Sequence, residues 1–391
     1  MKEVIFLHIG QAGAEIGSSC WDLFCLEHGI DREGIHTPVG DARDSSCEAV
    51  FTESSSGQYS PRAVFVDLEP SVLEKIATRN NIFKKDKFVS GKEDAASNYW
   101  RGFCETSNIS DRVQDAIRLS AEECDSFQGF ILSYSISGGT GSSATAYLMT
   151  ELNNEYKKVT NVGFSLFPSP KLSTAVVEPY NAVFATADLL DYMSAVFVID
   201  NEALYNVCSD SLKIESPTYS DINKVISQVV SSVTASLRFN GDLNANLSDF
   251  QTNLVPYPRI HFLLPSFTPF VSTTQTPNTV NDLTTTVYLP CSQLCTAEHS
   301  TGLYMASCLI YRGDVVPKDI NCAIAKIKND KSVRFVDWSP TGFKIGINPE
   351  VPITVSGTRL VRTVCKLDNT TAVRQVWDRI NRKVGFLTMY T

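Results

Sequence analysis

The chain has 391 residues and a net charge of −9, and 43% of its residues are hydrophobic while 20% are charged. This balance is typical of a folded protein with room for two domains, and it excludes an intrinsically disordered chain. The negative charge argues against a protein that coats nucleic acid, and no apolar run reaches the roughly 18 residues that a membrane-spanning helix needs. The first apolar run, Val4–Leu7, begins too early and is broken too soon by His8 to be a signal peptide.

The eleven cysteines are scattered along the chain, their number is odd, and no two have the CxxC spacing. Without a secretory signal, this distribution predicts reduced thiols in a cytosolic protein rather than disulfides or a zinc site. The five histidines show no pair at metal-ligand spacing, so we expect no transition-metal site.

The first half of the chain alternates short apolar runs with stretches of helical periodicity. We predict helices at 11–28 and Ala144–Asn154, and strands at Val4–Ile9, Ala63–Asp67, Gln128–Ile136, Val162–Phe167 and Ala195–Asp200. Near-continuous apolar strands interleaved with helices predict a parallel sheet that is covered on both faces. The expected fold class is therefore α/β, with a doubly wound, mostly parallel sheet of the nucleotide-binding type in residues 1–200.

The pattern changes in the second half. Residues 220–239 predict a long helix, apolar enough to be buried between two domains. Strand-like runs then outnumber helices, and they lie at Ile260–Leu264, Tyr304–Tyr311, Ser332–Trp338, Phe343–Asn348 and Leu360–Cys365. The Ser/Thr-rich segments 41–60 and 271–287 are expected to be loops. We therefore expect a smaller α+β domain over 201–366 around the central helix.

Two glycine-containing segments follow predicted strands and open predicted helices, which is where an anion can bind to helix N–H groups. The first, Gly10-Gln11-Ala12-Gly13, is weak evidence when taken alone, and a structural turn is the better interpretation of it. The second, Ser135–Ser143, is richer in glycine and hydroxyl side chains, so its backbone can close around phosphates. Because it contains no P-loop lysine, charge compensation must come from backbone donors and a cation.

Asp67 and Glu69 follow another predicted strand and offer the oxygen ligands that Mg²⁺ prefers. The spacing alone leaves a second interpretation open, in which these residues are a helix cap and solvated acids.

The glycine and threonine segment resembles the signature loop of the tubulin family, and the resemblance covers nearly the whole chain. It is carried by HIGQAGAEIGSSCWDLFCLEHGI (8–30), FVDLEP (65–70), GKEDAASNYWRG (91–102), STAVVEPYN (173–181), DNEALYNVC (200–208), SLRFNGDLNANLSDFQTNLVPYPRIHF (236–262), YRGDVVPKDI (311–320) and VDWSPTGFKIGIN (336–348). The FQTNLVPYPRIHF stretch is similar to the family's α subunits. The resemblance implies the tubulin/FtsZ-like arrangement of two domains around a long central helix.

The resemblance also implies a GTP site with Mg²⁺. Its phosphate contacts correspond to Gln11, Ala12, Asp94, Ser135, Gly138, Gly139, Thr140 and Gly141. Thr174 and Glu178 match residues near phosphate and ribose, and Glu69, with Asp67 beside it, matches the magnesium carboxylate. Asn201 and Asn223 match the asparagines that contact guanine, and Tyr219 matches the ring that stacks on the base. An amide offers both a donor and an acceptor, which suits guanine, and a tyrosine offers a flat face.

In the family, a loop of one subunit reaches the nucleotide of its neighbour. The resemblance therefore implies a cytoplasmic, cytoskeletal subunit that pairs with β-tubulin, builds microtubules, and supplies Asp249 in trans for hydrolysis of the partner's GTP. Asp249 replaces a glutamate, and Asn246 replaces a second carboxylate. Since a misplacement of about 1 Å can cost roughly 10²-fold in rate, we expect a slower GTPase.

Further departures concern the signature loop and the end of the chain. Ser137 and Ser143 replace glycines; we expect Ser143 to lie within a helix, whereas Ser137 would cost on the order of 1 kcal/mol if its position needs a positive φ. After Lys383 the resemblance dissolves. It therefore implies that residues 367–391 are a remnant of the family's C-terminal helical domain, without its outer helices and acidic tail. Binding of motors and microtubule-associated proteins is not expected. The alternative interpretation is a divergent paralogue that binds GTP or a β subunit without polymerising.

Overall fold

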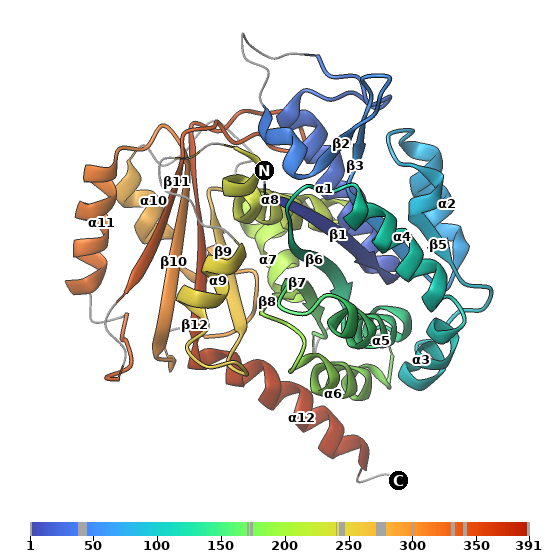
Figure 1. Cartoon of the computed structure of the whole chain (residues 1–391). Coiled ribbons are helices and arrows are strands. Elements are labelled where there is room, and N and C mark those ends of the chain that lie inside the picture. The colour runs from blue at the N-terminus through green and yellow to red at the C-terminus, as the bar shows by residue number, and fades with distance from the viewer. Residues whose placement is uncertain are drawn as a thin grey trace.

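A computed structural model of the chain describes residues 2–37, 45–169, 172, 175–239, 241, 247–270, 279–298, 301–329, 333–338 and 342–388. Within these residues a ten-stranded sheet runs through the molecule, and helices cover both of its faces (Figure 1). The sheet is continuous between the two halves of the chain, because β8 and β9 pair in parallel through Val196 and Phe197.

The strands of this sheet are β1 (Glu3–Ile9), β4 (Ala63–Asp67), β5 (Phe88–Ser90), β6 (Phe127–Ser135), β7 (Thr160–Phe167), β8 (Ala195–Asp200), β9 (Phe262–Thr268), β10 (Tyr304–Gly313), β11 (Phe343–Asn348) and β12 (Arg362–Thr370). Their spatial order is β11-β10-β12-β9-β8-β7-β6-β1-β4-β5. All neighbours from β5 to β9 are parallel, β12 is antiparallel to β9 and β10, and β11 is parallel to β10. A separate hairpin pairs β2 (Phe51–Glu53) with β3 (Tyr59–Pro61).

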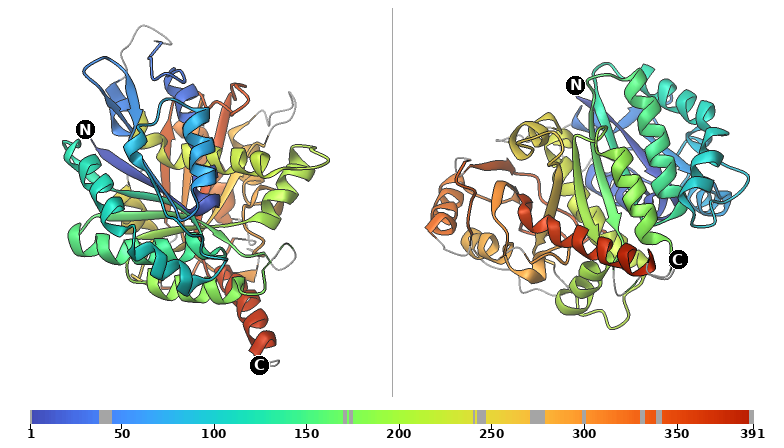
Figure 2. Two further views of the ribbon diagram at one scale, coloured as in Figure 1. Left: turned by 90° about the vertical axis from the view of Figure 1, so that its right-hand side faces the viewer. Right: turned by 90° about the horizontal axis from the view of Figure 1, so that it is seen from below.

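The helices are α1 (Gly10–His28), α2 (Pro70–Arg79), α3 (Tyr99–Ser107), α4 (Ser110–Glu122), α5 (Gly139–Glu155), α6 (Glu178–Leu189), α7 (Asn201–Asn206), α8 (Tyr219–Arg238), α9 (Leu247–Leu254), α10 (Val280–Thr286), α11 (Pro317–Asn329) and α12 (Arg374–Thr388). One hydrophobic cluster packs α1, α2, α8 and α9 against one face of the sheet. A second packs α4, α5, α6 and α12 against the other face, where α12 runs beside α6 (Figure 2). This arrangement confirms the predicted doubly wound α/β fold.

The predicted central helix is α8, and most of its residues from Ile222 to Arg238 are buried. A reciprocal capping box between Thr218 and Asp221 fixes its start, and Phe239 in extended conformation follows its end. Its apolar residues contact α1 on one side and β10 to β12 on the other, which places it between the two halves of the chain.

A buried ionic cluster ties these halves together. The carboxylate of Glu27 on α1 accepts from Arg238 Nη1 of α8 at 2.7 Å and lies 3.0 Å from Arg312 Nη1 of β10. Burial alone would raise the pKa of Glu27, but the two guanidiniums and the Ser231 hydroxyl lower it to about 2. The Glu27 carboxylate therefore links α1, α8 and β10 through buried ion pairs.

Some predicted elements differ from the structure. The strands predicted at Ala63–Asp67 and Ala195–Asp200 are confirmed at those bounds. The strand predicted at Ser332–Trp338 is wrong, because in the described part, 333–338, Phe335 makes only an isolated bridge with Tyr304.

The Ser/Thr-rich segments are not only loops. The hairpin of β2 and β3 lies largely in the first, and α10 lies in the second. Helix α10 forms because the Thr279 side chain caps it and because Val280 and Leu283 pack into a third hydrophobic cluster with β10 and α11. Residues 41–44 and 271–278 are outside the described residues.

All eleven cysteines are among the described residues, and none of them forms a disulfide. Within the described residues, no three His, Cys, Asp or Glu side chains gather as metal ligands. No helix in this part of the chain is both long and apolar enough to cross a bilayer.

Candidate nucleotide-binding site

A cavity of about 440 Å³ lies where β1, β4, β6, β7 and β8 end. In a doubly wound sheet this edge is the usual ligand site, because the loops that leave parallel strands meet there. Most of the residues predicted from the sequence line the cavity, namely Gln11, Ala12, Asp67, Glu69, Asp94, Ser135, Gly138, Gly139, Thr140, Gly141, Glu178, Asn201 and Tyr219. The structure therefore brings together segments that are far apart in the sequence.

The turns after β1 and β6 approach each other closely at the base of the cavity. Gly10 has a φ of +73°, and a Cβ atom there would lie 2.9 Å from the backbone nitrogen of Gly141, so only glycine fits. Helix α5 begins at Gly139, and no side chain of the described residues caps this end. Its first N–H groups thus remain available to an anion.

The two serines of the signature loop are accommodated without backbone strain. Ser143 lies within α5, as expected, and its Oγ donates to the carbonyl oxygen of Gly139 at 2.8 Å. Ser137 is not among the described residues with positive φ, so the condition under which a serine would be strained at this position is not met. Instead, the Ser137 and Ser135 hydroxyls lie 2.8 Å apart, and the Ser137 N–H donates to Ser135 Oγ at 3.3 Å.

The loop before α3 is where the backbone is strained. Ala96 and Ser97 have φ values of +45° and +56°, a conformation that costs about 1–3 kcal/mol for a residue other than glycine. Asp94 supports this loop by accepting from the Ala96 N–H at 3.2 Å, and Asn98 caps α3. Both strained residues line the cavity.

Asn181 of α6 is a residue that the sequence interpretation missed. Its side-chain nitrogen donates to the carbonyl oxygens of Ser97 at 2.8 Å and Ser137 at 3.0 Å, and its oxygen accepts from the Tyr99 N–H at 3.2 Å. This buried amide therefore fixes the strained loop against the signature loop. It lies in the quoted segment STAVVEPYN, but nothing in one sequence indicates that it bridges two distant loops.

Asp67 and Glu69 lie at the acidic side of the cavity. Asp67 is only 3% exposed, and burial raises its pKa to about 6, with Glu69 adding to the shift and backbone hydrogen bonds opposing it. Glu69 is exposed and accepts from Ser71 Oγ at 2.6 Å. No cationic side chain of the described residues pairs with Asp67, so this buried carboxylate fits a site for a divalent cation held by oxygen ligands.

The opposite side of the cavity carries the residues predicted to contact a base. Asn201 is the first residue of α7, whose start is capped by Asp200 through the Glu202 N–H at 2.9 Å. Tyr219 begins α8 and is 63% exposed. Asn223 is buried one turn later on the same face of α8 and does not line the cavity as described. Thr174 lies outside the described residues.

Asp249 is not part of this cavity. It lies in the first turn of α9, with a half-buried side chain, and Lys344 Nζ of β11 approaches its Oδ2 to 3.5 Å. Asn246, in the preceding loop, is outside the described residues.

The fold and the cavity together define a nucleotide-binding α/β protein. Residues 3–209 match the model of the Tubulin/FtsZ family GTPase domain, and residues 258–382 match that of the tubulin C-terminal domain. The chain is 47% identical to the tubulin alpha-2 chain of Caenorhabditis elegans over 396 residues, which cover 99% of this chain and 88% of the relative. It is 46% identical to the tubulin alpha-8 chain of the same organism over the same extent. The chain belongs to the tubulin family, as a structural subunit with a GTPase domain.

Proposed function

We propose that the chain binds GTP with Mg²⁺ in the 440 Å³ cavity and acts as an α-type subunit that pairs with β-tubulin in cytoplasmic microtubules. The observation that carries this proposal is the convergence of the phosphate, magnesium and base residues on one cavity at the carboxyl edge of the sheet. The similarity to α chains supports the choice of partner. The proposal also divides the chain into three domains: a GTP-binding domain over 1–200, an intermediate α+β domain over 201–366, and a C-terminal segment over 367–391.

Each side of the cavity has a role in this proposal. The N–H groups at the start of α5, together with Gln11, Ala12, Asp94 and Ser135, bind the phosphates. Asp67 and Glu69 hold Mg²⁺, which supplies positive charge beside phosphate oxygens. Glu178 and Thr174 lie toward the ribose, Asn201 and Asn223 hydrogen-bond to guanine, and Tyr219 stacks on it. Since the described cavity contains no lysine or arginine, backbone donors and the cation must balance the phosphate charge.

In this proposal Asp249 acts on the nucleotide of the neighbouring subunit. Its carboxylate accepts a proton from water while the water oxygen bonds to the γ-phosphorus and the bond to the β–γ bridging oxygen breaks. General-base help of this kind is worth about 10²–10⁴-fold. The aspartate is one methylene shorter than the glutamate implied by the resemblance, so we expect the lower part of this range.

One observation favours the alternative, a family member that binds GTP without driving turnover in a polymer. Lys344 Nζ lies 3.5 Å from Asp249 Oδ2, so an ammonium group competes with water for the carboxylate. In this alternative, the nucleotide cavity keeps its role and Asp249 serves the structure of α9.

A co-sedimentation experiment separates the two. The chain, tagged at its N-terminus, is expressed in its own cells, and the microtubules of the lysate are assembled, pelleted, depolymerised in the cold and assembled again. We expect the chain to follow each cycle. Retention in the supernatant, with GTP still bound, would support the alternative instead. Asn223→Ala, which removes one proposed guanine contact, serves as the variant that should lose both GTP and co-sedimentation.

A further inference from the structure

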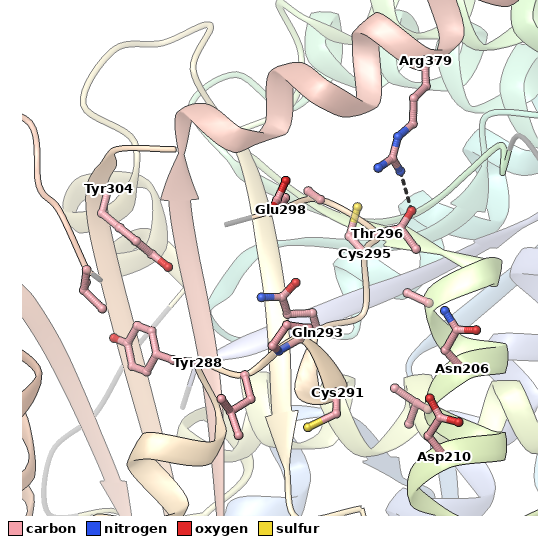
Figure 3. A pocket seen from close by; sticks show the side chains of 16 residues that line it. Asn206, Asp210, Tyr288, Cys291, Gln293, Cys295, Thr296, Glu298, Tyr304 and Arg379 are labelled. Atoms are coloured by element: carbon pink, nitrogen blue, oxygen red, sulfur yellow. Dashed lines mark hydrogen bonds between the residues drawn. The ribbon is translucent and has the colours of Figure 1, made fainter. Parts of the chain in front are cut away.

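A second and larger cavity, of about 800 Å³, lies between α7, the segment from Tyr288 to Glu298, and α12 (Figure 3). It shares no lining residue with the nucleotide cavity among the described residues. Its walls are largely apolar, with Ala203 and Val207 on one side and Leu289 and Pro290 on the other. A volume in this range suits a molecule of drug-like size.

The most informative residue in this cavity is Gln293. It is only 7% exposed, yet its side-chain amide has no hydrogen-bond partner among the described residues. Its backbone is satisfied separately, since its N–H donates to the carbonyl oxygen of Pro290 at 3.2 Å. Figure 3 shows the amide projecting into the cavity. A sheltered amide with a free donor and a free acceptor matches a ligand edge that carries an adjacent acceptor and donor.

Arg379 of α12 provides further donors at the same cavity. Its Nη1 donates to Thr296 Oγ1 at 2.6 Å, which holds the guanidinium at the cavity wall (Figure 3). No acceptor among the described residues hydrogen-bonds to its Nε or Nη2, so these donors remain available to a ligand. Such donors suit a carbonyl oxygen.

The charges around the cavity decide between a neutral and an anionic ligand. Among the described residues that line it, Arg379 is the one cation, whereas Asp210 and Glu298 are exposed carboxylates on its rim. The balance is negative, so a phosphate or a carboxylate would be repelled while a neutral carbonyl would not.

We propose that this cavity binds a neutral, planar ring molecule that carries a lactam or primary amide edge. The amide edge pairs with Gln293, a carbonyl oxygen accepts from Arg379, and the ring lies against the apolar walls. The proposal does not depend on the function proposed above, because it concerns separate residues and a separate ligand.

The experiment uses Cys291, which lines the cavity and is exposed, as a reporter. The rate of its alkylation by N-ethylmaleimide is measured on the purified full chain by mass spectrometry, with 2-quinolone as the neutral lactam probe. At about twice the dissociation constant, the free fraction falls to about a third, so we expect about three-fold slower alkylation of Cys291. Cys104 and Cys322 are exposed elsewhere, on α3 and α11, and should react unchanged.

Two matched probes and two variants make the test specific. N-Methyl-2-quinolone lacks the N–H donor, and quinoline-2-carboxylate is an anion, so neither should protect Cys291. Gln293→Met keeps the length of the side chain but removes the amide, and protection by 2-quinolone should disappear. If this variant does not fold, Arg379→Met tests the same prediction. The proposal is overturned if 2-quinolone gives no protection at its solubility limit, if the methylated probe protects equally, or if a folded variant is still protected.

Discussion

Two buried carboxylates in this protein have opposite environments. Glu27 lies within 3.0 Å of two guanidinium groups, which lower its pKa to about 2. Asp67 has no cationic partner among the described residues, and burial raises its pKa to about 6. The first carboxylate is neutralised by the fold itself, whereas the second has its charge balanced only when a cation arrives. The comparison separates a region built for stability from a region built for a ligand.

Helix capping and backbone strain also differ between the region around Glu27 and the nucleotide cavity. Helix α8, beside Glu27, starts with a complete capping box. Helix α5, at the nucleotide cavity, starts without a side-chain cap among the described residues, and the neighbouring loop holds Ala96 and Ser97 at positive φ. Uncapped N–H groups and strained loops lower stability, and they persist where a ligand makes use of them.

The largest expected effect comes from removing the charge of Glu27, which holds the buried ionic cluster together. Glu27→Gln leaves two buried guanidiniums without a carboxylate, which should lower the free energy of unfolding by about 3–5 kcal/mol. Urea denaturation measures the change. Glu74→Gln, on the exposed face of α2, is the control and should stay within about 0.5 kcal/mol of the parent. Equal stability of the two variants would show that the cluster does not hold the two halves together.

Acid should destabilise the protein through two buried histidines. Burial lowers the pKa of His8 and of His28 to about 3, with Arg238 adding to the shift of His28. The unfolded chain binds these protons below about pH 6.5 and the folded chain does not, so stability falls as the pH decreases from there. Each histidine should cost about 2 kcal/mol by pH 5. A stability that is flat between pH 7 and pH 5, measured by urea denaturation, would contradict this assignment.

Asp67→Asn, at the nucleotide cavity, should stabilise the protein, whereas Glu27→Gln should destabilise it. A raised carboxyl pKa means that stability decreases as the pH rises from about 4 through 6, so removing the charge should stabilise the ligand-free protein by about 3 kcal/mol at pH 7. The same variant should retain GTP less well when Mg²⁺ is present. Thermal unfolding and nucleotide content measure both. A gain in stability without loss of GTP would argue against a magnesium site at Asp67.

The smallest effect concerns backbone strain. Ala96→Gly removes the backbone strain of a non-glycine residue at positive φ, but glycine also gives the unfolded chain more conformational entropy. The net gain in stability should be about 0.5–1 kcal/mol. Ser137→Gly is the matched control in the facing loop. Because Ser137 is not at positive φ, the change should give no gain and should lose the contact with Ser135. A larger gain in stability from Ser137→Gly than from Ala96→Gly would show that the backbone is strained at Ser137 instead.

The fold was predictable from the sequence where a single pattern determines the element. The apolar runs 63–67 and 195–200 are short, fully buried strands, and their periodicity needs no knowledge of their neighbours. The cavity was predictable for a related reason, since residues that follow parallel strands must meet at one edge.

What the sequence did not predict depends on contacts between distant segments. The positive φ of Ala96 is held by the surrounding loops rather than by its residue type. Asn181 contacts residues from two other loops, and a single sequence does not pair them. Helix α10 has a threonine-rich sequence of low helix propensity, and its cap and its packing against β10 outweigh that propensity.

The cluster around Glu27 also has a consequence for synthesis. Glu27 emerges from the ribosome early, Arg238 much later, and Arg312 later still. Until both arginines are made, the Glu27 carboxylate lacks its two guanidinium partners, and the sheet still lacks β11 and β12. The first half of the chain thus waits, partly open, for the second, and its exposed apolar strands need shielding during that interval. A protein joined in this way completes its fold only once Arg312 and the last strands of the sheet have been made.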